Sequence, residues 1–405
     1  MKIGLIYDAA YPWSIGGGEK TLYELAVELR NRGHEPHLFT MHWWDGPADM
    51  VRDGLHYHAV CPRMPIYNSN GKRLILQPLR FAWGLFTRLP RLSPQSFDLF
   101  DVHVFPFFSV IAFWMVRLLC GGRIPWLLTW LEVWGRPYWK RYLGLSGIIG
   151  MLIERLCARL VPVHLCISPT MARRLHDLLG VSNDRIHMIP RGFRPPENWR
   201  AQETKQAEKV VVVNRLIDYK RVDQIVRAWQ RVHNALPAAR LHIIGDGPER
   251  EALQQLAEQS GMTSSIHFHG FFAEREAVLE MIADAELLVQ PSAREGQSTV
   301  VLEAMSLGTA VLAATGPETA VADFFTEIED RDAILLPVDA EPDRWAESII
   351  HLLRDHELRL RLVDSCRKQG DRFRWEQAIA PRIEALYRSL ATSARSRALD
   401  LFPSN

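Results

Sequence analysis

The chain has 405 residues, with 48 Lys and Arg against 47 Asp and Glu, 47% hydrophobic residues and 23% charged residues. This is the profile of an ordinary globular protein, and it excludes disordered, collagenous and disulfide-scaffold proteins. At about 100 to 200 residues per domain, the length predicts two domains, each with a core of its own.

The near-zero net charge conceals two unequal halves. Residues 1–200 contain 24 Lys and Arg and 15 Asp and Glu, a charge of +9, whereas residues 201–405 have a charge of −8. Halves of opposite charge suggest different partners, and we expect no nucleic acid among them. Five cysteines without metal-ligand spacing predict reduced core thiols in a cytoplasmic protein. We expect neither a signal peptide nor a transmembrane helix.

The first part of the chain alternates apolar strands with helices of 3.6-residue period. Residues 2–7 predict a strand, which a Gly-rich loop joins to a helix over Glu19–Asn31 with Gly33 as its C-cap. Further strands are predicted at residues 34–40, 97–105, 126–130 and 163–168. This alternation is typical of a doubly wound parallel sheet.

A second series of the same kind follows a Pro-rich stretch, residues 189–199, which we interpret as the linker. Its strands are predicted at residues 209–216, 240–245, 265–270, 286–291, 309–314 and 333–337. Its helices are predicted at residues 222–236, 249–260, 274–283, 300–307 and 342–353. The fold class is therefore α/β, with two Rossmann-like domains that face each other across a cleft.

Glycines follow the first strand of the first series and a middle strand of the second. Gly16, Gly17 and Gly18 precede a helix, where backbone amides can approach a phosphate closely. A dinucleotide site would need glycine at Thr21, so NAD binding is disfavoured, while a plain tight turn stays open. Gly245 stands in a sharp turn of the kind that lines a cleft.

Two cations and two carboxylates follow strands of the second series. Arg215 and Lys220 can clamp a diphosphate, although a solvated basic turn has the same pattern. Glu295 and Glu303, with seven residues between them, flank the start of a predicted helix. Free amides at a helix start form an anion site, and carboxylates accept hydrogen bonds from sugar hydroxyls. We interpret the pair as a nucleotide-sugar site; a helix-start Glu favoured by the dipole is the alternative.

His103 ends another strand of the first series, where it either binds a sugar hydroxyl or is a satisfied buried histidine. Asp330 and Asp332 match the DxD pattern of some metal-dependent sugar transferases, but no further ligand accompanies them. We therefore expect a solvated loop there, and no metal or other cofactor in the protein.

Five elements in this order, GGGE, DVH, NRLIDYKR, GDGP and EGQSTVVLEAM, resemble the retaining glycosyltransferases of family 4, which have the GT-B fold. The resemblance covers nearly the whole chain. It implies an acceptor-binding domain over residues 1–195, a donor-binding domain over residues 196–375, and a last helix within 376–405 that packs back on the first domain.

The resemblance also implies a role for each motif residue. Arg215 and Lys220 would bind the donor diphosphate together with Gly16, Gly17, Gly18 and Gly245. Glu303 would bind the ribose, while Glu295, Gly296, Gln297, Ser298 and Thr299 would hold the donor sugar, with His103 beside it. Asp101, Leu131, Arg191 and the Gln297–Thr299 stretch depart from the family pattern.

The activity so implied is transfer of a sugar, expected to be a hexose, from a nucleotide-diphosphate sugar to an acceptor hydroxyl, with retention and without a metal. The acceptor is expected to be a cell-surface glycan or a lipid-linked saccharide. A catalytically inactive nucleotide-sugar-binding subunit is the alternative; an epimerase and a phosphorylase are less favoured.

Residues 72–91 combine five cations with Leu, Ile, Phe and Trp. Such a composition suits peripheral contact with the cytoplasmic face of an anionic membrane. A core helix with a basic outer face is the alternative interpretation.

Overall fold

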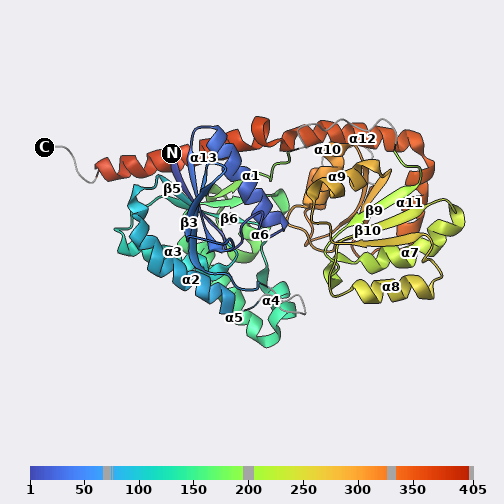
Figure 1. Ribbon diagram of the computed structural model, residues 1–405, viewed down its shortest axis with the longest axis horizontal. Coiled ribbons are helices and arrows are strands. Elements are labelled where there is room, and N and C mark those ends of the chain that lie inside the picture. The colour runs from blue at the N-terminus through green and yellow to red at the C-terminus, as the bar shows by residue number, and fades with distance from the viewer. Residues whose placement is uncertain (67–73, 75, 195–204, 326–333, 401–405) are drawn as a thin grey trace. The chain divides into compact units, whose positions relative to one another are not determined.

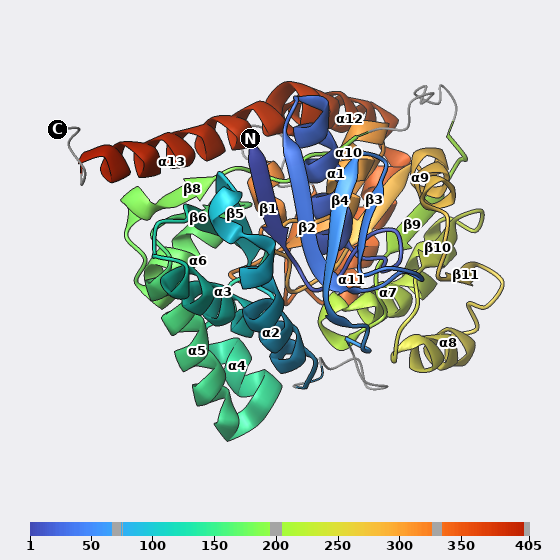
Figure 2. The same cartoon turned by 60° about the vertical axis from the view of Figure 1, so that its left-hand side comes forward.

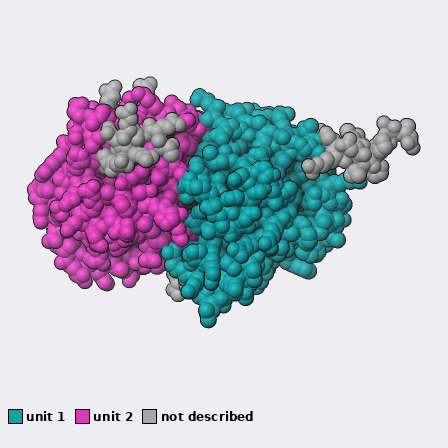
Figure 3. All heavy atoms as spheres, turned by 180° about the vertical axis from the view of Figure 1, so that it is seen from behind, with its two compact units in different colours: residues 1–68, 72–192, 375–405 teal, residues 69–71, 193–374 magenta. Residues whose placement is uncertain are grey.

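The computed structural model describes residues 1–66, 74, 76–194, 205–325 and 334–400. The chain divides into two compact units, shown in teal and magenta in Figure 3. Unit 1 comprises Met1–Asn68, Lys72–Gly192 and Trp375–Asn405, and unit 2 comprises Ser69–Gly71 and Phe193–Arg374. The chain thus enters unit 2 after Gly192 and returns to unit 1 at Trp375.

Unit 1 is built on an eight-stranded sheet with the order β3-β4-β2-β1-β5-β6-β7-β8. All neighbouring strands are parallel except β3 and β4, which form an antiparallel pair. The strands are β1 Lys2–Ile6, β2 Glu35–His42, β3 Asp49–Arg52, β4 Leu55–Pro62, β5 Leu99–His103, β6 Trp126–Trp130, β7 His164–Cys166 and β8 Ile186–Met188. The sequence analysis missed β3, β4 and β8, although apolar residues alternate with histidines at the start of β4, which is a strand pattern.

Helices cover both faces of this sheet (Figures 1 and 2). One face packs against α1 (Gly17–Asn31) and α13 (Ala380–Asp400). The other packs against α2 (Leu76–Arg88), α3 (Phe107–Leu119), α5 (Gly147–Leu160) and α6 (Pro169–Leu179), with α4 (Gly135–Leu143) against α5. Among the described residues no helix combines the length and apolar character that crossing a membrane requires.

Unit 2 is built on a six-stranded, fully parallel sheet with the order β11-β10-β9-β12-β13-β14. Its strands are β9 Lys209–Val213, β10 Arg240–Ile244, β11 Ile266–Gly270, β12 Leu287–Gln290, β13 Ala310–Thr315 and β14 Leu335–Pro337. Its helices are α7 Val222–Ala235, α8 Arg250–Gln259, α9 Arg275–Asp284, α10 Thr299–Leu307, α11 Pro342–Arg354 and α12 His356–Gly370. The predicted strands and helices of this unit are all present, with ends that shift by a few residues.

Each sheet reverses its winding direction between two particular strands, β1 and β5 in unit 1 and β9 and β12 in unit 2. In doubly wound sheets the loop after one such strand runs to one face of the sheet and the loop after the other runs to the opposite face. Ligands bind in the crevice between these two loops. The predicted site residues follow these four strands, apart from Gly245, which follows β10. The topology therefore brings residues far apart in sequence to the carboxyl edge of each sheet.

The returning C-terminal segment is held to unit 1 by polar contacts as well as by its apolar face. Trp375 Nε1 donates to Glu24 at 2.8 Å, and Arg32 pairs with Glu384 of α13 at 3.0 Å. Residues 394–400 continue α13.

Candidate functional site

The loop after β9 carries Arg215, which is exposed, and Lys220, which is largely buried. Gly245 lies against this loop with φ +127°, and an added Cβ there would sit 1.9 Å from the Asn214 carbonyl oxygen. Only glycine allows this approach at such a φ. Gly245 thus helps to position the Arg215 loop.

A buried side chain at the end of β12 organises the polar groups around it. Gln290, which is 1% exposed, accepts a hydrogen bond from Asn214 Nδ2 at 2.7 Å. Its own amide nitrogen donates to Glu295 Oε1 at 2.7 Å and to Ser298 Oγ at 3.3 Å. Gln290 therefore ties the loop after β9 to the loop after β12. The sequence analysis missed it, although a polar residue closing an apolar strand was a visible signal.

Lys220 and Glu295 form an ion pair within unit 2, with the Lys220 ammonium donating to Glu295 Oε1. Their side chains are only 15% and 12% exposed. Glu295 is also fixed through its backbone, since its N–H donates to the Glu318 carbonyl at 3.1 Å. The structure thus brings together two residues that the sequence placed 75 positions apart.

The helix α10 begins immediately after this pair. Ser298 is its N-cap, and its hydroxyl accepts a hydrogen bond from the Val301 N–H at 3.4 Å. Thr299 is the first helical residue, Gln297 is buried, and Gly296 lies between Glu295 and this cap. Amides in a first helical turn have no intrahelical acceptor, so this end can bind an anion.

Glu303 projects from the second turn of α10 and is 3% exposed. It forms an ion pair with Arg275, the first residue of α9. Its Oε2 atom is buried and accepts no hydrogen bond from the residues that the structure describes. A buried carboxylate oxygen without a partner is costly, and a ligand hydroxyl would satisfy it. Arg275 was not expected from the sequence.

In unit 1, Gly16 is the N-cap of α1, and Gly17 and Gly18 form the start of this helix. An added Cβ at Gly18 would lie 2.6 Å from the Tyr7 hydroxyl oxygen. The Tyr7 ring also contacts the His103 ring, with 5.3 Å between their centroids. Tyr7, which the sequence analysis did not single out, therefore links the glycine turn to the end of β5.

His103 is 2% exposed, and neither ring nitrogen has a hydrogen-bond partner among the described residues. Burial, with a smaller contribution from the charge of Arg191, lowers the pKa of His103 to about 3. The imidazole is therefore neutral at physiological pH, with one nitrogen that can donate and one that can accept. No described residue satisfies the ring by hydrogen bonding, and the role of His103 at a sugar hydroxyl stays a prediction.

Asp101, one of the departures from the family pattern, lies on β5 and is fully buried. It accepts hydrogen bonds from Thr129 Oγ1 at 2.6 Å and from Tyr387 Oη of α13 at 2.5 Å. Burial raises the pKa of Asp101 to about 6. The residue thus fastens the C-terminal helix to the sheet of unit 1.

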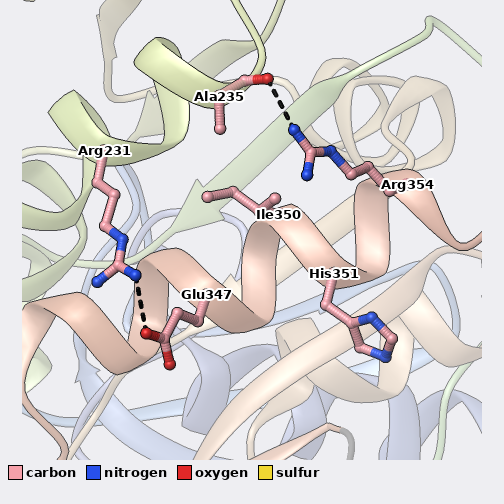
Figure 4. Close-up of a pocket in the computed structure, with 6 residues that line it drawn as sticks. All are labelled: Arg231, Ala235, Glu347, Ile350, His351 and Arg354. Atoms are coloured by element: carbon pink, nitrogen blue, oxygen red, sulfur yellow. Dashed lines mark hydrogen bonds and ion pairs between the residues drawn. The ribbon is translucent and has the colours of Figure 1, made fainter.

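Asp330 and Asp332 lie outside the described residues. A hollow between α7 and α11 is bordered by an ion pair, Arg231 to Glu347 at 2.8 Å, and contains none of the predicted site residues (Figure 4). The five cysteines are free thiols, as expected.

Comparison with known proteins gives two family matches, one in each half of the chain. Glycosyltransferase Family 4 matches residues 15–195, and Glycosyl transferases group 1 matches residues 195–369. The N-acetyl-alpha-D-glucosaminyl L-malate synthase of Bacillus anthracis is 23% identical over 398 residues, which cover 96% of each chain.

Solved structures show the same fold at low identity. Sucrose-phosphate synthase from Thermosynechococcus elongatus has a TM-score of 0.75 at 18% identity, covering 97% of this chain and 99% of its own. Anabaena Alr3699/HepE, solved in complex with UDP-glucose, has a TM-score of 0.66 at 16% identity, covering 98% of this chain and all of its own.

Proposed function

Because the chain belongs to the group 1 and family 4 glycosyltransferases, we propose that it transfers a hexose from a nucleotide-diphosphate sugar to an acceptor hydroxyl with retention of configuration. The expected GT-B fold is confirmed, with one parallel α/β sheet in each unit. That the protein is a glycosyltransferase follows from the family; its donor, its acceptor, retention and independence of metal are our proposals.

The observation that carries this proposal is the Lys220–Glu295–Gln290 cluster at the switch point of unit 2. It places a cation, a carboxylate and the start of α10 side by side in a nearly buried setting. A diphosphate needs the cation and the amides, whereas sugar hydroxyls need the carboxylate. No other set of described residues in unit 2 combines these three kinds of group around one hub.

We assign the leaving diphosphate to Lys220 and Arg215, and the donor sugar to Glu295 with Gly296, Gln297, Ser298 and Thr299. As the bond from the anomeric carbon to the diphosphate oxygen breaks, its electron pair stays on the diphosphate. Lys220 and Arg215 then stabilise the charge that develops, which is commonly the largest contribution to such catalysis. The acceptor oxygen bonds to the same face of the sugar and its proton leaves with the diphosphate, so no protein nucleophile is required.

Glu303 is assigned to the ribose hydroxyls of the donor nucleotide. Its Oε2 atom, buried without a hydrogen-bond partner among the described residues, would accept from a hydroxyl, while the ion pair with Arg275 holds the carboxylate in place. Glu303→Gln should therefore weaken nucleotide binding more than it lowers kcat.

In unit 1, we assign His103 to a hydroxyl of the donor sugar and Gly16, Gly17 and Gly18 to the diphosphate. The neutral imidazole of His103, which has no hydrogen-bond partner among the residues that the structure describes, can accept one hydrogen bond and donate one. The amides at the start of α1 are suited to an anion.

The test is release of nucleotide by the purified full chain with UDP-, GDP-, ADP- and dTDP-sugars, each with and without EDTA. One donor should be turned over slowly without acceptor, unaffected by EDTA, and Glu295→Ala should abolish the release. Tight donor binding without release, with or without candidate acceptors, would favour the inactive-subunit alternative. Product anomer analysis by NMR then decides between retention and inversion.

We further propose that the acceptor lies at an anionic membrane, which helices α2 to α5 of unit 1 contact. Of the 17 exposed large apolar side chains among the residues that the structure describes, twelve lie on this segment: Leu76, Leu79, Trp83, Met115, Leu118, Leu119, Leu143, Leu145, Ile148, Ile149, Leu152 and Leu156. The helices form a continuous layer, since α2 packs on α3, α3 on α5 and α5 on α4. An apolar surface of this extent marks an interaction site.

The charge of the same layer favours anionic lipid as its partner. Helices α2, α3 and α4 contain no acidic residue, and the one in α5, Glu154, is buried. Glu154 accepts hydrogen bonds from Trp134 N, Gly135 N and Trp139 Nε1 at 2.6, 2.9 and 2.8 Å. Exposed cations, by contrast, accompany the apolar side chains: Arg80, Arg136, Lys140, Arg141 and Arg159. Basic and apolar groups together bind anionic interfaces.

Vesicle flotation tests this surface. We expect binding to vesicles that contain phosphatidylglycerol, little binding to phosphatidylcholine alone, and loss of binding in the variant Ile148→Glu/Ile149→Glu. Leu360→Glu is the matched control, because Leu360 is exposed to a similar extent but lies in unit 2. Equal flotation of the double variant and the wild type would contradict the assignment.

A further inference from the structure

A cluster of histidines and carboxylates lies at the edge of the unit 1 sheet where β2 begins. Glu35 and His37 project from one face of β2, and His56 and His58 from the same face of β4, with His37 paired in register with His56. Asp49, at the start of β3, is paired in register with His58. This is the amino edge of β2, whereas Gly16 to Gly18 and His103 follow the carboxyl ends of β1 and β5. The proposed transfer chemistry uses none of these side chains.

We propose that Glu35, His37 and His56 bind a divalent transition-metal ion of the Zn²⁺ class. The candidate ligand atoms of the three residues all lie within 4.8 Å of one another. Ligands at about 2.0 Å from a tetrahedral Zn²⁺ are roughly 3.3 Å apart, so the three ligand atoms must move closer together to bind one ion. Carboxylate oxygen and imidazole nitrogen are ligands that this metal accepts, and three protein ligands leave one position for water.

The surroundings of His37 are those of a metal ligand. His37 Nε2 lies 2.7 Å from Glu35 Oε1, and its Nδ1 lies 2.8 Å from His58 Nε2. His58 Nδ1 in turn lies 2.8 Å from Asp49 Oδ1, and Arg88 donates to the other oxygen of Asp49 at 2.5 Å. Metal-bound histidines typically have such a partner on the second nitrogen, which orients the ring.

The hydrogen bonds of this row can be satisfied either by one additional proton or by a bound cation. Three hydrogen bonds join Glu35, His37, His58 and Asp49, and each needs one hydrogen. Two neutral imidazoles supply two, and ionised carboxylates supply none. A metal on His37 Nε2 and Glu35 replaces the first bond. His37 Nδ1–H then donates to His58, and His58 Nδ1–H donates to Asp49, so every group is satisfied.

His56 completes the set from the solvent side. Its ring stacks on that of His37, with 4.4 Å between centroids and 15° between planes, and makes no hydrogen bond to a described residue. Because a metal lies in the plane of the ring that binds it, the His56 ring must turn about its Cβ–Cγ bond. The side chain is partly exposed, and Glu35 is 52% exposed, so the ion can enter from solvent.

The experiment is Zn²⁺ titration of the untagged full chain after EDTA treatment and dialysis, with a chromophoric chelator as competitor. We expect one tight equivalent, at least tenfold weaker binding in Glu35→Gln and His56→Ala, and a 10-fold to 100-fold weaker site in His58→Ala, which removes only the orienting partner. Glu35 and His56 are not core residues, and unchanged unfolding midpoints without metal would confirm that these variants are folded.

The control is the variant His242→Ala/His269→Ala in unit 2. These two histidines are hydrogen-bonded at 2.8 Å, like His37 and His58, but the charge acting on them is that of Lys209 rather than a carboxylate. This variant should retain the tight equivalent. No tight Zn²⁺ in the wild type, equal affinity in Glu35→Gln, or loss of the site only in the control variant would each overturn the proposal.

Discussion

Replacing Lys220 by methionine removes the ammonium group but keeps a side chain of similar length. The ammonium donates to Glu295 Oε1 in a pair whose side chains are 15% and 12% exposed. In the proposed reaction it moves to the diphosphate as negative charge develops there. Removing one such donor typically lowers kcat by about 10²-fold to 10³-fold, or about 3 to 4 kcal/mol of barrier. We expect this loss in kcat for Lys220→Met.

The same change also affects stability, because Glu295 loses its cation. Gln290 still donates to Glu295 at 2.7 Å, so the carboxylate keeps one hydrogen bond. An ion pair of intermediate burial, such as Lys220–Glu295, should contribute about 1 to 2 kcal/mol to the free energy of unfolding. Adding Glu295→Gln should recover most of that stability while leaving kcat low, since the neutral amide needs no cation.

The assay is the initial rate of nucleotide release at saturating donor, together with urea unfolding followed by tryptophan fluorescence. Lys368→Met is the matched control, since Lys368 pairs with Asp364 at 3.0 Å on α12 but both side chains are more than two-thirds exposed. The control should change neither quantity by more than about 0.5 kcal/mol. A kcat of Lys220→Met within threefold of wild type would refute the assignment of Lys220 to the leaving group.

Three further predictions concern the framework of the site. Tyr387→Phe removes the hydroxyl that donates to Asp101 at 2.5 Å and should lower the free energy of unfolding by about 1.5 to 3 kcal/mol in urea titrations, without changing the donor specificity. Because burial raises the pKa of Asp101 to about 6, the folded state holds the carboxyl proton more tightly than the unfolded state does. The resulting stabilisation is complete below about pH 4 and is lost as the pH rises through 6. The Asp101→Asn variant lacks this titration. The difference in free energy of unfolding, variant minus wild type, should therefore rise by up to about 3 kcal/mol between pH 4 and pH 7, and a difference that does not change with pH would contradict this. Gly245→Ala should lower donor affinity and stability, since its Cβ would meet the Asn214 carbonyl oxygen at 1.9 Å; Gly261→Ala, at φ +69° with open space around it, should cost only about 1 kcal/mol.

The sequence alone predicted the α/β class, the two-domain division and most strands and helices, and it supplied most of the residues of the proposed site. Strands and helices are encoded by local periodicity, which explains why every predicted element of unit 2 is present. The motif residues could be placed at strand ends because the carboxyl edge of a parallel sheet is where such loops gather. The strands β3, β4 and β8 were not predicted. On β4, His56 is one of the three proposed metal ligands, and His58 is the partner of another, His37.

Only the tertiary structure decided which groups meet. Gln290 joins Asn214 to Glu295, Arg275 pairs with Glu303, and Tyr387 reaches Asp101 across 286 positions of sequence. Such contacts depend on strand order, on register and on where the C-terminal helix returns, and none of these leaves a periodic signal in the chain. For the same reason only the tertiary structure shows that the His103 imidazole is buried, which keeps it neutral, and that it has no hydrogen-bond partner among the described residues.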